Sequence, residues 1–164
     1  MNLLKLYEMQ KKLDERIRHD HHLENKNLFQ EKIVALIVEV SELANETRCF
    51  KYWSEKPSSP PEIILEEYVD GLHFIFSIGI ELNFIVDKLN ENTVDKEEAD
   101  LVSQFLKVFR HIQLFANSKD RNDYEQLLVQ FFKLGYILGF TNEEIRLAYL
   151  AKNEINHQRQ DQGY

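Results

Sequence analysis

All three prolines of this 164-residue chain lie in one short segment, at Pro57, Pro60 and Pro61. Proline interrupts helices and central strands, so this segment marks a turn and leaves long proline-free stretches on either side. The chain also has only five glycines. A chain so poor in turn-forming residues does not suit an all-β fold, and its 43% hydrophobic residues exclude disorder. The sequence therefore predicts a compact all-α fold.

The length fits a single domain, residues 1–164, with residues 91–123 as a candidate mobile helical cap. Apolar residues at three- and four-residue spacing predict a multi-helix bundle. The helices expected span about 3–17, 28–53, 61–89, 97–116, 124–138 and 141–160. Capping boxes are expected at Ser59 to Glu62 and at Thr141 to Glu144, and residues 95–98 are expected to cap the fourth helix.

The formal net charge of −8 makes binding to DNA or RNA unfavourable without a basic patch, and none is evident. Cys49 is the only cysteine, which favours a reducing compartment. The N-terminal apolar run is too short for a signal peptide, and the later apolar runs carry charges. We therefore expect a cytoplasmic protein with no nucleic-acid or membrane partner.

Four carboxylates stand inside the two most apolar predicted helices, one pair on each side of the proline segment. Glu39 and Glu42 form an ExxE motif, and Glu67 and Asp70 form an ExxD motif. At about 100° per residue each pair shares one helix face, so two antiparallel helices could present the pairs to each other. Buried anions need a cation, and Mg2+ prefers carboxylate oxygens. The alternative is a solvated groove, or pairing of these acids with Lys and Arg.

The last predicted helix carries Lys152, Asn156 and Arg159 at positions i, i+4 and i+7. One helix face therefore offers two cations and an amide, a combination that suits phosphate groups. The alternative is that the cations only complement the C-terminal end of the helix dipole.

The sequence around these residues resembles the dimeric dUTPases of Gram-positive bacteria and their phages, within the all-α nucleoside triphosphate pyrophosphatase superfamily of MazG-like enzymes. The resemblance is carried by ELANETRCFKYWS at 42–54, EEYVDGLHF at 66–74 and KNEINHQRQ at 152–160. It covers most of the chain, apart from about 91–123.

The resemblance implies that a homodimer hydrolyses dUTP to dUMP and pyrophosphate with Mg2+. The matching metal ligands are Glu39, Glu42, Glu67 and Asp70. Glu42 is our candidate for the catalytic carboxylate that orients or deprotonates the attacking water. The chemistry is reasonable, because carboxylate-held metal ions both neutralise phosphate oxygens and lower the pKa of bound water.

The resemblance also makes Lys152, Asn156 and Arg159 phosphate-binding residues. The residues expected to bind the nucleoside are Gln10, Asp14, Trp53, Phe74 and Asn153. His73 projects away from the Glu67 and Asp70 face, so it is expected to pack or to support other site residues.

Two other functions stay open. The first is a pyrophosphatase for another nucleotide, such as dCTP or a damaged nucleotide, because its metal motif would be identical. The second is a non-enzymatic helical interaction module whose acidic face binds a partner.

Overall fold

The computed structural model describes residues 2–88 and 100–163, which form six helices and no strand. The helices are α1 (Leu3–Asp20), α2 (Phe29–Thr47), α3 (Pro61–Glu81), α4 (Leu101–Ser118), α5 (Arg121–Ile137) and α6 (Asn142–Asp161). The predicted all-α fold is therefore confirmed for the described part of the chain. None of these helices is long and apolar enough to cross a membrane.

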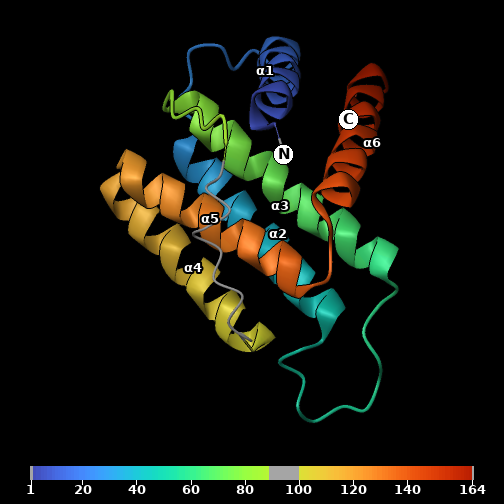
Figure 1. Ribbon diagram of the computed structural model, residues 1–164. Helices are drawn as coiled ribbons and strands as arrows, with labels where there is room; N and C mark the ends of the chain where they lie inside the picture. Colours follow the sequence, from blue (N-terminus) through green and yellow to red (C-terminus); the bar gives the residue numbers. More distant parts are fainter. Residues whose placement is uncertain (1, 89–99, 164) are drawn as a thin grey trace.

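Helix α3 lies at the centre of the bundle, with α1 and α6 on one side and α2, α4 and α5 on the other (Figure 1). It contacts α1, α2, α5 and α6. Its Tyr68, Leu72 and Phe76 are fully buried in the hydrophobic core. Because core residues pack against α3 on several sides, the backbone of α3 holds its polar residues at fixed places in the bundle.

Gly71 allows α5 to approach α3 closely. A Cβ atom at Gly71 would lie 2.8 Å from Cζ of Phe131 on α5, which is too close for a side chain. The neighbouring Tyr68 ring stacks on Phe131 at 4.7 Å between centroids. The backbone that carries Asp70 is thus packed directly against the core.

Helices α2 and α3 end earlier than the apolar pattern predicts. Arg48 adopts a left-handed conformation (φ 57°) and ends α2 at Thr47, not near residue 53. Asn83 is also left-handed (φ 59°), and the N–H groups of Asn83 and Phe84 bond to Ile80 and Gly79. This pair of bonds is a Schellman motif, which ends α3 at Glu81 although the following residues stay apolar.

The predicted capping box at Ser59 is wrong. Pro60 is the N-cap of α3 and makes no side-chain capping bond, while the Ser59 hydroxyl donates to the Glu46 carboxylate. Pro61 does stand at the first helical position. The box at Thr141 is confirmed: its hydroxyl accepts from the N–H of Glu144, and the Glu144 carboxylate accepts from the N–H of Thr141.

Helix α4 begins at Leu101, and the Asp100 side chain caps it. The cap predicted at residues 95–98 lies outside the described residues. Within the proposed mobile segment 91–123, α4 buries Val108 and Ile112 completely in the core. A mobile cap therefore stays a prediction that no contact of α4 supports.

Candidate active site

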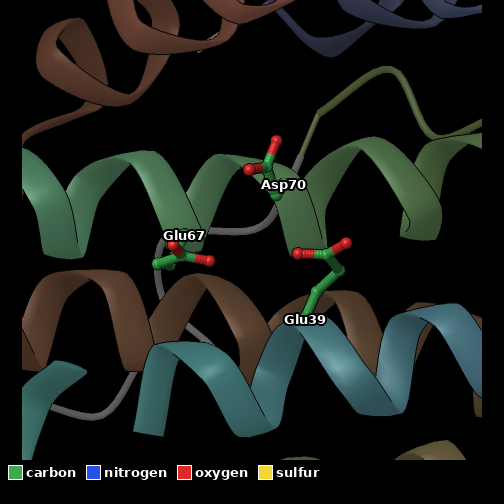
Figure 2. A group of neighbouring side chains, drawn as sticks. All are labelled: Glu39, Glu67 and Asp70. Carbon is green, nitrogen blue, oxygen red and sulfur yellow. The ribbon is translucent and has the colours of Figure 1, made fainter. Parts of the chain in front are cut away.

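Three of the four predicted metal ligands come together where α2 faces α3. Glu39 on α2 and Glu67 and Asp70 on α3 each offer an oxygen within 4.8 Å of the others, and all three are half-buried. In Figure 2, the carboxylates of Glu39 and Glu67 lie between α2 and α3, and Asp70 lies beside them on α3. We call Glu39, Glu67 and Asp70 the acidic cluster.

Burial and mutual repulsion make ionisation of the acidic cluster unfavourable. Burial, followed by the charges of Asp70, Glu42 and Glu67, raises the pKa of Glu39 to about 7. Burial also raises the pKa of Glu67, to which Asp70 and Glu42 add. Carboxyl groups in this state take up protons or bind a cation.

Glu42 is exposed and does not belong to the acidic cluster. It lies one turn after Glu39 on α2, and its charge raises the pKa values of both Glu39 and Glu67. Glu42 is therefore close enough to act on the cluster electrostatically while its carboxylate stays in contact with water.

Lys152 on α6 reaches the acidic cluster from the far side of α3. Its Nζ lies 2.6 Å from Oδ2 of Asp70 and 2.8 Å from Oε1 of Glu66, and the residue is 6% exposed. Burial alone lowers the pKa of Lys152, but the hydrogen bonds to Asp70 and Glu66 outweigh it and raise the pKa. The predicted phosphate ligand is thus bound to two carboxylates.

A pocket of about 510 Å3 opens beside the acidic cluster, between α1, α2, α3 and α6. Glu39 and Asp70 line it at one side, so the cluster and the pocket are continuous. The pocket is also lined by the predicted site residues Gln10, Asp14, Phe74, Asn156 and Arg159. Its size and mixed lining suit a small polar ligand with an apolar part.

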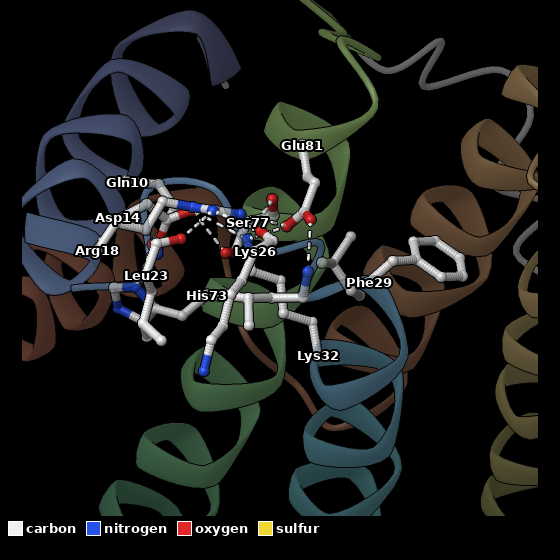
Figure 3. Close-up of polar contacts among 12 residues, drawn as sticks. Gln10, Asp14, Arg18, Leu23, Lys26, Phe29, Lys32, His73, Ser77 and Glu81 are labelled. Atoms are coloured by element: carbon white, nitrogen blue, oxygen red, sulfur yellow. Dashed lines mark hydrogen bonds and ion pairs between the residues drawn. The ribbon is translucent and has the colours of Figure 1, made fainter. Parts of the chain in front are cut away.

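Ion pairs and hydrogen bonds connect four residues that line the pocket, Asp14, Arg18, Lys32 and Ser77, with Glu81 (Figure 3). Asp14 accepts from the Ser77 hydroxyl at 2.5 Å and lies 3.7 Å from Nζ of Lys32. Lys32 also pairs with Glu81 at 2.6 Å, and Arg18 pairs with Glu81 at 3.1 Å. Burial raises the pKa of Asp14, while the charge of Lys32 opposes the rise. This network holds α1, α2 and α3 together.

Sequence reasoning missed Lys32 and Ser77, although spacing could have identified them. Lys32 lies seven residues before Glu39, and Ser77 lies seven residues after Asp70. Seven residues are close to two helical turns, so each shares a face with an acid of the cluster. Glu81 and Arg18 carry no such signal, because only the packing of three helices brings them together.

Two of the predicted nucleoside-binding residues do not line the pocket. Trp53 is 65% exposed in the loop after α2, where its ring packs edge-on against Tyr52 at 5.0 Å. Asn153 is buried, and its Nδ2 has no hydrogen-bond partner among the described residues. A contact of either residue with a nucleoside stays a prediction.

A family model described as dUTPase matches residues 2–164 of the chain. The match therefore includes every helix described above. A search of curated proteins found no match.

Proposed function

The chain belongs to the dUTPase family and hydrolyses dUTP to dUMP and pyrophosphate, and we propose that the acidic cluster holds Mg2+ for this reaction. Three carboxylate oxygens within 4.8 Å of one another are a suitable donor set for a hard divalent cation. The raised pKa of Glu39 supports the proposal, because burial and then the neighbouring acids disfavour its charged form, and a bound cation would offset both.

Bound Mg2+ would neutralise phosphate oxygens and lower the pKa of a coordinated water. The protein supplies the rest of the chemistry. We propose that Glu42, the exposed carboxylate beside the cluster, completes the ligand set and orients the attacking water or takes its proton. Its contact with solvent suits the release of that proton.

Asn156 and Arg159 line the pocket and would bind the phosphate groups that extend beyond the acidic cluster. Lys152 would reach a phosphate by leaving one of its two carboxylates, and a metal ion that binds Asp70 would weaken that ion pair. At the other end, Gln10, Asp14 and Phe74 would contact the nucleoside. The pocket thus joins a polar end for the nucleoside to an acidic end for the metal.

A turnover panel of dUTP, dCTP, dTTP and UTP tests the substrate and the metal together. We expect a kcat/KM for dUTP at least about 100-fold above that for dCTP, because a site that hydrogen-bonds one base leaves polar groups unpaired with another. Removal of Mg2+ with a chelator should abolish turnover, and added Mg2+ should restore it. Equal turnover of dUTP and dCTP, or turnover without a divalent ion, would contradict the proposal.

We also propose that the protein is a homodimer that acts in the cytoplasm. The support for a dimer is an apolar surface on adjacent helices: Val34 and Val38 on α2 and Leu106 on α4 are 61%, 46% and 65% exposed. Light scattering of the purified protein should give twice the chain mass of 19.6 kDa. A single-chain mass at micromolar concentration would refute the dimer, and cell fractionation tests the location.

A further inference from the structure

The carboxamide of Gln10 is held by three groups from three helices. Its Nε2 donates to Oδ1 of Asp14 at 2.7 Å. Its Oε1 lies 2.6 Å from the Tyr149 hydroxyl of α6 and 2.6 Å from Nδ1 of His73 on α3. Gln10 is only 4% exposed, yet it lines the pocket.

The neighbours of Gln10 determine which way the amide points. An ionised carboxylate can only accept hydrogen bonds, so Asp14 requires the amide nitrogen on its side. Oε1 therefore faces Tyr149 and His73, and both must donate to it. His73 is neutral, because burial lowers its pKa to about 3, so its single N–H is at Nδ1. The His73 ring is fixed in turn by stacking on Tyr149 at 3.9 Å.

These bonds leave the Gln10 amide with only an N–H group available to a ligand. Two donors occupy the two lone pairs of Oε1, and Asp14 takes one of the two N–H groups of Nε2. Among the described residues, Nε2 has no second acceptor. Gln10 thus presents an N–H donor, and no acceptor, to a ligand in the pocket.

We propose that His73 and Tyr149 are positioning residues that set base specificity by fixing the Gln10 amide with its donor toward the base. A donor that faces position 4 of the base pairs with the carbonyl oxygen of uracil and is unfavourable beside the amine that cytosine carries there. If Oε1 lost its two donors, Asp14 alone would orient the amide, and its N–H would be held less firmly toward the base. The inference rests on the proposed role of Gln10 in nucleoside binding.

Tyr149→Phe and His73→Leu each remove one donor and keep a buried apolar side chain of similar size. Each is expected to raise KM for dUTP about 10-fold and to lower the ratio of kcat/KM for dUTP over dCTP about 10-fold, with kcat for dUTP nearly unchanged. His73→Asn should retain a near wild-type ratio, because the Asn amide can place an N–H where Nδ1 lies. Calorimetric titration with dUMP should show the same order of affinities without turnover.

Tyr124→Phe is the matched control, because Tyr124 is a buried tyrosine whose hydroxyl bonds to Tyr7 and to the Ile75 carbonyl, away from the pocket lining. It should lower thermal stability and leave the dUTP to dCTP ratio of kcat/KM unchanged.

If Tyr149→Phe behaves like Tyr124→Phe, the positioning inference is wrong while the proposed function stands. If the wild-type protein does not prefer dUTP to dCTP, the proposed function itself fails. If His73→Leu does not fold, Tyr149→Phe and His73→Asn still decide the question.

Discussion

Glu39→Gln is expected to lower kcat/KM for dUTP by about 1,000-fold or more and, in the absence of metal, to make the folded protein more stable. The activity is lost because the neutral amide binds a divalent cation poorly, and a metal ion supplies several kcal/mol of transition-state stabilisation. The stability rises because the substitution removes a charge that is disfavoured first by burial and then by the neighbouring acids. Steady-state kinetics and thermal denaturation with a chelator measure the two effects.

Glu39 suits this test because, like Glu67, it makes no hydrogen bond or ion pair with any other described residue. Asp70→Asn would also break the contact with Lys152, so its effects would be mixed. Glu8→Gln makes the same chemical change at an exposed position on α1 and should leave both activity and stability unchanged. The metal-site proposal would be refuted if Glu39→Gln kept more than about a tenth of the activity, since that loss is only ~1.4 kcal/mol.

The stability difference between Glu39→Gln and the wild-type protein is expected to grow as the pH rises. Folding raises the pKa of Glu39 from 4.5 to about 7, so the folded state binds the proton more tightly than the unfolded state does. The wild-type protein therefore loses stability as the pH rises from about 4.5 through 7. Because Glu39 is half-buried and partly screened by water, we expect a loss of ~1–2 kcal/mol, or ~2–8 °C in melting temperature.

The comparison is made between the two proteins because His73 acts in the opposite direction. Its lowered pKa destabilises the folded state as the pH falls below about 6.5, but this contribution is the same in both proteins and cancels. Melting curves from pH 5 to 8 in a chelator measure the difference. A difference that stays constant over this range would show that the pKa of Glu39 is not raised.

Mg2+ should reverse the order of stability at pH 8. At a concentration 100 times its dissociation constant, a ligand that binds only the folded state adds ~2.7 kcal/mol. The wild-type protein should therefore gain ~5–10 °C in melting temperature, whereas Glu39→Gln should gain little. An equal gain in melting temperature in both proteins would show that the ion does not bind at Glu39.

The fold class and the acidic helices could be predicted because their signals are local. Apolar spacing identified the helices, and the placement of Glu39, Glu67 and Asp70 in apolar segments indicated that these acids could form one cluster. The ends of α2 and α3 were missed because Arg48 and Asn83 adopt left-handed conformations that end the helices. The spacing of apolar residues does not predict such a conformation.

The surroundings of Gln10 could not be predicted, because its partners come from sequence-distant helices. His73 was expected to pack or to support the site, and it does contact Gln10, 63 residues away. Tyr149 gave no signal, since a tyrosine in an amphipathic helix is ordinarily part of the core. Lys152 was predicted to bind phosphate from the family resemblance, whereas its pairing with Asp70 depends on how α6 crosses α3.

Helix α3 carries groups for both ends of the proposed substrate: Glu67 and Asp70 belong to the acidic cluster, and His73 and Ser77 lie at the pocket end that would receive the nucleoside. A helix rises 1.5 Å per residue, so Glu67 and Ser77 are about 15 Å apart along one rigid axis. Other helices pack against this axis on several sides. The distance between the proposed metal site and the proposed base site is therefore set by one rigid helix and does not adjust to the length of the ligand.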